Sequence, residues 1–281
     1  MKPFRIGAVV ALALLVAGAA VLEAHDLFLR PRDFIVREGR PVEVRVLSGT
    51  WSASQGAVSP DRLRDLSVAG PAGVIHAERS AWLSAGRESH WTVKLGPPGT
   101  YVLAASLIPR TIRLNSSQFT EYLTEEGLSN VVAERKAAGI HADSARERYS
   151  KHIKALVRVL GSSTTRATAD TMYRVPLGYP AELLPLEDPY RLARGDTLHV
   201  RALVDGAAVE GQTVLVGGNT LSGTPVLERQ LRTDGSGQAN VRLDHRGAWY
   251  LKFIRMRQLP ASAGDSVDYE SKWATLTFAV P

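Results

Sequence analysis

Cysteine is absent from the 281-residue chain. Its absence excludes a disulfide framework, a thiol nucleophile, an iron–sulfur cluster and any zinc site with cysteine ligands. Long hydrophobic runs are also missing beyond the N-terminus, where no stretch approaches the ~18 consecutive apolar residues of a membrane-spanning helix. We therefore expect that the body of the chain is not an integral membrane protein.

Charge of one sign is not concentrated anywhere in the sequence. The chain has 34 Lys and Arg residues against 28 Asp and Glu residues, and its formal net charge is +6. These charges are scattered singly, without the runs of like charge or the basic stripe of a nucleic-acid-binding module. We expect a mildly basic, solvated surface and no nucleic-acid partner.

The sequence motifs of common catalytic classes are missing as well. There is no Gly-x-Ser-x-Gly elbow, no P-loop, no Gly-x-Gly-x-x-Gly that opens a helix after a strand, and no His-Glu-x-x-His. No two of the seven histidines have the i, i+2 or i, i+4 spacing of a local metal motif. The sequence thus indicates no enzyme class, and any metal site has to assemble from distant parts of the chain.

The N-terminus has the pattern of an export signal. Lys2 and Arg5 form a short basic start, and residues 6–22 are an unbroken run of apolar and small residues. Small residues permit cleavage after Ala19 or after Ala24. We interpret residues 1–24 as a signal peptide and predict a periplasmic or otherwise exported protein that is soluble after cleavage.

The remaining composition, 44% hydrophobic and 22% charged over the whole chain, is typical of a globular protein. Residues 25–112 contain short runs that alternate apolar and polar side chains, for example Val42, Val44 and Val46 on one face. Gly-Pro and Pro-Pro-Gly turns separate these runs. We predict a mainly β chain whose N-terminal unit, residues 25–112, is an antiparallel Ig-like β-sandwich.

Residues 113–194 are predicted to be a helical insert followed by an extended linker. Phe119, Tyr122 and Leu123 have helical spacing between a possible cap at Asn115 or Ser116 and a stop at Gly127. Residues 129–138 suggest a second helix. Ser144 and Glu147 form a capping-box pattern that predicts a third helix up to residue 160, with these side chains on one face: Tyr149, Ile153, Leu156 and Leu160. Residues 161–170 lack apolar periodicity and are the predicted linker.

A second Ig-like sandwich is predicted over residues 195–281. Alternating runs at 198–204 and 212–216 are separated by the Asp205-Gly206 turn, and further strand-like runs extend to the C-terminus. Four of the five tryptophans are interpreted as core residues: Trp82, Trp91, Trp249 and Trp273. The remaining core prediction comprises Tyr149, Ile153, Leu156, Val200, Val214, Leu251 and Phe278.

Histidine is the only residue type that suggests chemistry. If cleavage follows Ala24, His25 becomes the first residue and offers an α-amine and an imidazole beside the carboxylate of Asp26. Amine and imidazole nitrogens chelate Ni, Cu, Co or Zn. The opposing interpretation is that His25 is only the start of the first strand. His152 is a further candidate ligand, although it falls on the apolar face of the predicted third helix and is better explained as a hydrogen-bonded boundary residue.

Several motifs follow one another in order along nearly the whole mature chain: Ala24-His25-Asp26-Leu27-Phe28-Leu29, Phe119-x-x-Tyr122-Leu123-x-x-Glu126-Gly127-Leu128, Arg148-Tyr149-Ser150-Lys151-His152, Gly178-Tyr179-x-x-Glu182-Leu183-Leu184-Pro185, and Trp273-Ala274-Thr275-Leu276-Thr277-Phe278. Together they resemble an exported bacterial family of unknown function, formerly described as a nickel-uptake transporter substrate-specific region. The C-terminal unit also resembles carboxypeptidase-regulatory-like β domains, which are mostly non-catalytic.

The resemblance implies a link to nickel or cobalt uptake, with His25 as the position carried over. Family members often have a second histidine where this chain has Arg255, which puts a second imidazole ligand in doubt. We therefore predict a non-enzymatic exported binding protein for a divalent transition metal, Ni or Co first and Cu not excluded, with a membrane transporter component as partner. Its predicted ligands are His25, Asp26 and His152.

Two other function classes remain open at this point. One is a structural or scaffold module of the envelope without a small ligand. The other is an N-terminal-histidine copper oxygenase acting on polysaccharide, which requires a flat aromatic face that the scattered tryptophans do not suggest.

Overall fold

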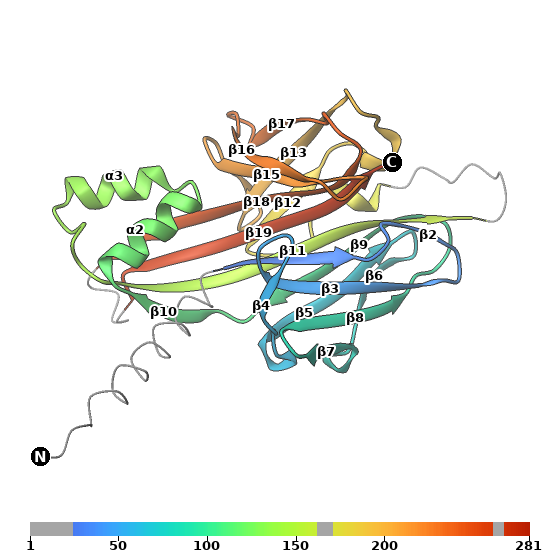
Figure 1. Cartoon of the computed structure of the whole chain (residues 1–281), viewed down its shortest axis with the longest axis horizontal. Coiled ribbons are helices and arrows are strands. Elements are labelled where there is room, and N and C mark those ends of the chain that lie inside the picture. The colour runs from blue at the N-terminus through green and yellow to red at the C-terminus, as the bar shows by residue number, and fades with distance from the viewer. Residues whose placement is uncertain (1–24, 162–170, 261–266) are drawn as a thin grey trace, which may run out of the picture.

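The computed structural model describes residues 25–161, 171–260 and 267–281. The predicted signal peptide, residues 1–24, and residues 162–170 of the predicted linker lie outside the described residues. Within the described part the protein is mainly β, and its strands form three sheets in which most neighbouring strands are antiparallel (Figure 1). The prediction of a mainly β chain is therefore confirmed.

The largest sheet has ten strands, drawn from both ends of the chain. They are β2 (Ile35–Arg37), β5 (Leu63–Gly70), β6 (Gly73–His76), β9 (Gly99–Leu107), β10 (Arg110–Leu114), β11 (Ala145–Leu160), β15 (Thr213–Thr220), β16 (Pro225–Arg232), β18 (Gly247–Gln258) and β19 (Tyr269–Val280). The order is β16-β15-β18-β19-β11-β9-β5-β6, and β10 and β2 also pair with β11. Because β11 is antiparallel to β9 and parallel to β19, it joins strands of both predicted sandwiches in one sheet.

Two smaller sheets cover opposite faces of the large sheet. The five-stranded sheet comprises β1 (Asp26–Pro31), β3 (Pro41–Gly49), β4 (Ser54–Gly56), β7 (Trp82–Ala85) and β8 (Glu88–Lys94). The four-stranded sheet comprises β12 (Ala181–Pro185), β13 (Thr197–Val204), β14 (Ala207–Ala208) and β17 (Gln238–Arg242). On β11, Ile153 and Val157 pack into the core under the five-stranded sheet, whereas Leu156 packs into the core under the four-stranded sheet. Successive side chains of a strand point to opposite faces, so β11 is covered on both.

The predicted third helix, residues 144–160, is wrong, because this segment is the 16-residue strand β11. Nearly all of its residues are buried, since both faces of the strand are covered. A strand buried in this way lacks the alternation that identifies a half-exposed strand. Its Ala, Leu, Lys, Arg and Glu residues also favour helix when propensity alone is considered. The predicted capping residue Glu147 is instead buried and accepts hydrogen bonds from Tyr122 and Ser271.

The other two helices of the predicted insert are confirmed as α2 (Ser116–Glu125) and α3 (Ser129–Ala137). Asn115 caps α2 through a capping box with Gln118. Phe119, Tyr122 and Leu123 are buried on the inner face of α2, as their spacing predicts. Gly127, with φ of 70°, then turns the chain in the left-handed conformation that glycine adopts most readily.

The predicted core residues are confirmed, because each has 3% or less of its surface exposed. The four tryptophans interpreted as core are among them. Within the described residues, no helix combines the length and apolar character needed to cross a membrane.

Replacement of Leu156 by alanine tests whether β11 holds the two halves together. Leu156 is fully buried, so Leu156→Ala should lower the free energy of unfolding by roughly 2–5 kcal/mol. Leu160→Ala on the same strand is the matched control, since Leu160 is 45% exposed and should cost less than about 0.5 kcal/mol. Equal losses in chemical denaturation would contradict the two-sided burial of β11.

Candidate functional site

The start of β1 lies among charged side chains that come from distant parts of the sequence. We call His25, Asp26, Glu126, Lys151 and Lys252 the His25 cluster. Asp26 begins β1 and His25 directly precedes it. Glu126 is the C-cap of α2, Lys151 lies on β11 and Lys252 lies on β18. The structure therefore brings the predicted ligands His25 and Asp26 next to three charged residues that the sequence did not single out.

Backbone contacts fix the position of β1 over the large sheet. β1 pairs with β3 in a register that places Asp26 opposite Gly49. On β19, the hydroxyls of Thr275 and Thr277 donate hydrogen bonds to the carbonyls of Leu27 and Leu29, at 2.9 and 2.6 Å. A side chain at Gly49 would meet the carbonyl of Ala53 at 2.6 Å, so glycine permits the close approach of the next loop. These contacts hold His25 and Asp26 in place.

Lys252 is the central cation of the His25 cluster. Its Nζ lies 2.5 Å from Asp26 Oδ2, 2.9 Å from Glu126 Oε2 and 3.8 Å from Glu228 Oε2. Burial opposes its charge, but the surrounding carboxylates outweigh burial and raise the pKa of Lys252. Burial, together with the negative charge of Asp26, raises the pKa of Glu126 to about 7.

Lys151 closes the cluster on the β11 side. Its Nζ donates a hydrogen bond to the main-chain carbonyl of His25 and lies 4.8 Å from the centre of the Trp273 ring. Burial lowers the pKa of Lys151 to about 8. Burial and the nearby charge of Lys151 also lower the pKa of His25, so its imidazole stays neutral, the form in which histidine binds metals.

Two polar atoms of the cluster are buried without a hydrogen-bond partner: His25 Nε2 and Asp26 Oδ1. Such atoms destabilise the fold, because they lose their hydrogen bonds to water on burial and form none with the protein. Within the described residues, however, no group of three or more His, Cys, Asp or Glu side chains is arranged to hold a metal ion. The described part of the chain therefore presents unpartnered ligand atoms on two consecutive residues rather than a complete set of protein ligands.

His152 does not join this site. His152 and Lys151 are neighbours on a strand and therefore point to opposite faces of the sheet. The His152 ring is hydrogen-bonded to Ser106 Oγ at 2.9 Å and to Ser150 Oγ at 3.1 Å. Burial lowers the pKa of His152 to about 3, so the ring is neutral. Both ring nitrogens are satisfied, which is the arrangement of a structural histidine.

Sequence reasoning missed Glu126, Lys151 and Lys252, although Lys252 carried a signal. Lys252 stands alone in an otherwise apolar strand run, Trp249-Tyr250-Leu251-Lys252-Phe253-Ile254. A lone lysine at such a position must find a buried counter-charge. Lys151 was hidden because the strand that carries it was interpreted as a helix with an exposed polar face.

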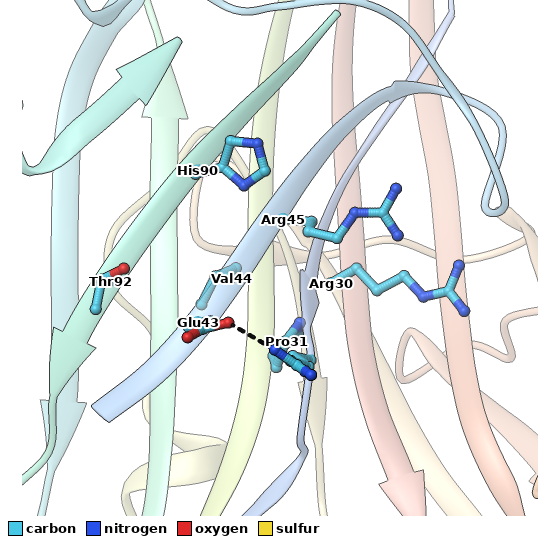
Figure 2. A pocket seen from close by; sticks show the side chains of 8 residues that line it. Arg30, Pro31, Glu43, Val44, Arg45, His90 and Thr92 are labelled. Atoms are coloured by element: carbon cyan, nitrogen blue, oxygen red, sulfur yellow. Dashed lines mark hydrogen bonds and ion pairs between the residues drawn. The ribbon is translucent and has the colours of Figure 1, made fainter. Parts of the chain in front are cut away.

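A second polar surface lies on the outer face of the five-stranded sheet, beside a hollow of about 510 Å³ (Figure 2). Arg30, Arg45 and His90 lie opposite one another on β1, β3 and β8. Arg45 pairs with Glu88, which also lies 4.0 Å from His90. Arg30 donates to the carbonyl of Trp51 at 2.6 Å and stacks over its ring. We call Arg30, Arg45 and His90 the Arg45 ladder. Because the negative charge of Glu88 compensates much of their positive charge, the Arg45 ladder is a weaker candidate site than the His25 cluster.

Removal of the Lys252 ammonium should lower the free energy of unfolding, because two buried carboxylates then lack a counter-charge. Lys252→Met leaves Asp26 and Glu126 without their cation, and breaking a buried pair in this way costs about 3–5 kcal/mol. Because the folded-state pKa of Glu126 is raised to about 7, above its ordinary 4.5, ionised Glu126 destabilises the fold as pH rises through this range. We expect a larger loss of unfolding free energy at pH 8 than at pH 5.

Lys272→Met is the control for this experiment, because Lys272 pairs with the exposed Asp205. Such surface pairs contribute about 0–1 kcal/mol. Equal losses for the two variants, or a Lys252→Met loss that does not change between pH 5 and pH 8, would contradict the buried-charge interpretation.

Comparison with known proteins identifies a family, and the function of that family is unknown. The family model described as "Domain of unknown function (DUF4198)" matches residues 22–257. No curated protein matches the chain. Among solved structures, one titled "Biofilm associated protein - BSP domain" is similar over 89% of this chain with 10% identity and a TM-score of 0.20. The match spans 29% of that longer chain. The chain belongs to the DUF4198 family of domains of unknown function.

Proposed function

We propose that the chain is an exported, non-enzymatic binding protein that holds a divalent transition metal, nickel or cobalt first, at the start of β1. The observation that carries this proposal is that two consecutive residues, His25 and Asp26, each have a buried side-chain atom without a hydrogen-bond partner, Nε2 and Oδ1. Imidazole is a favourable ligand for Ni, Co and Cu, and a carboxylate oxygen adds negative charge. A cation held by the His25 imidazole and by Asp26 would give Asp26 Oδ1 the partner that the fold does not provide.

The third donor in this proposal is the α-amine of His25, which signal cleavage after Ala24 would create. The amine and Nδ1 of the same residue close a small chelate ring, and Nε2, on the far side of the imidazole, does not contact the ion. His152 was predicted as a further ligand, but it lies on the other face of the sheet and is already hydrogen-bonded. The proposal therefore rests on His25 and Asp26.

Sequence features support the cellular setting of this proposal. The basic and apolar N-terminus is typical of an export signal. The motifs also resemble a family formerly described as a nickel-uptake transporter substrate-specific region. In this proposal the chain works in the periplasm and passes its metal to a membrane transporter component. Copper binds such ligands more tightly than nickel does, so metal supply would decide which ion is bound.

The alternative proposal is a scaffold module of the envelope without a small ligand. Its support is the architecture: β11 ties the two halves together, and each face of the large sheet is covered by another sheet. The predicted pair of Ig-like sandwiches, 25–112 and 195–281, and the resemblance of the second to carboxypeptidase-regulatory-like domains belong to this alternative. Loss of metal binding in the experiments below would favour it.

Metal binding should depend on His25 and on the position of its amine. Calorimetry with Ni²⁺ should give one site per chain for the processed protein, and His25→Ala should weaken binding by a factor of about ten or more. One extra N-terminal glycine should weaken it too, because the glycine moves the amine away while the ring stays intact. His141→Ala is the control, since His141 is an exposed histidine outside the cluster. Equal binding by all four proteins would overturn the proposal.

Mass spectrometry of the exported protein tests the assumption on which the chelate depends. We expect His25 as the first residue. A mature chain that starts at Ala20 would remove the amine from the proposed donor set and leave only the side chains of His25 and Asp26.

A further inference from the structure

A separate hollow of about 340 Å³ lies beside Lys151, between the five-stranded sheet and the large sheet. Its lining residues come from β1, β3, β4 and residues 57–62, and from β9, β10 and β11 of the large sheet. We call it the Lys151 pocket. Its volume is in the range of pockets that hold small organic molecules, about 300–1,000 Å³.

The lining of the Lys151 pocket carries charge of one sign. Arg62, Arg110 and Lys151 line it, and no aspartate or glutamate is among its lining residues. This distinguishes it from the hollow at the Arg45 ladder, which is lined by Glu43. Clefts lined by one sign of charge concentrate ligands of the opposite sign.

The three cations lie at different depths. Arg110 is exposed at the rim, Arg62 is partly buried, and Lys151 is buried. Arg110 is paired in register with Tyr149, two residues from Lys151 on the same face of the sheet, so the two cations are diagonal neighbours across β10 and β11. A ligand that meets both needs anionic groups at two points.

Arg62 adds a donor that the protein leaves unused. It ends the short 3₁₀ helix η1 (Pro60–Arg62), and its Nη2 donates to the carbonyl of Ile108 at 3.3 Å. Its Nε is buried and has no hydrogen-bond partner, and no ion pair to Arg62 is present among the described residues. A guanidinium in this condition is suited to a carboxylate, which accepts two parallel N–H bonds.

Neutral polar groups complete the lining. Ser48, Gln55 and Ser59 border the pocket and supply hydroxyl and amide groups beside the cations. Leu27 and Leu107 add apolar wall. The combination suits a small organic anion with hydrogen-bonding substituents better than a bare ion, which would contact only one level of the pocket.

We propose that the Lys151 pocket is a binding site for a small di- or tricarboxylate, held by Arg62, Arg110 and Lys151. One carboxylate contacts Arg62 and Lys151 inside the pocket, and another contacts Arg110 at the rim. The site does not require the metal proposed at His25, because its three cations are side chains of the protein. Arg62 and Arg110 lie on the β10 side of Lys151, whereas Lys252 lies on the β19 side.

Calorimetry on metal-free processed protein in a carboxylate-free buffer tests this site, with citrate and inorganic phosphate as probes. Citrate should bind one per chain and more tightly than phosphate. Arg110→Gln and Arg62→Gln should each weaken citrate binding by a factor of about ten or more. Arg110 is exposed and Arg62 is partly buried, so both variants should fold. Lys151→Met is avoided, because Lys151 is buried and its replacement could prevent folding.

Arg113→Gln is the matched control, because Arg113 is an exposed arginine on the same strand as Arg110 and does not line the pocket. It should leave citrate affinity within about twofold of wild type, and so should His25→Ala, which separates this site from the metal site. Absence of citrate binding at millimolar concentration, phosphate binding as tight as citrate, or an equal loss in Arg113→Gln would each overturn the proposal.

Discussion

The pairing of β11 with β9 on one side and β19 on the other is the contact on which the rest of the structure depends. β11 lies in the middle of the ten-stranded sheet. It is hydrogen-bonded to β9, from the first half of the chain, and to β19, from the second half. Both of its faces are covered, so every side chain along most of its length must be either apolar or paired.

The polar residues of β11 show how this requirement is met. Lys154 forms a buried ion pair with Glu182, whose carboxylate also accepts three backbone N–H groups. His152 is satisfied by two serine hydroxyls on the same face. On the opposite face, Lys151 reaches the carbonyl of His25. The strand thus carries a structural charge pair on one side and the edge of the candidate site on the other.

The position of His25 follows from this arrangement. β1 is an edge strand, and its register with β3 and its threonine contacts with β19 place the first described residues over β11 and β18. Lys252 there neutralises Asp26 and Glu126, which would otherwise repel each other in a buried space. The same packing leaves His25 Nε2 and Asp26 Oδ1 without partners. The functional proposals therefore concern the seam where the five-stranded sheet meets the large one.

The sequence by itself determined the mainly β class, the helices α2 and α3 and much of the core, because these depend on local periodicity, caps and apolar side chains. It also pointed to His25 and Asp26 through their place after the predicted export signal. It did not determine β11, since a strand covered on both faces has no alternating pattern to detect. Nor did it group Glu126, Lys151 and Lys252 with His25, because these residues are far apart along the chain. Only the tertiary structure decided which charges share a buried space, because a buried charge is stabilised by whichever partners the packing of distant strands brings to it.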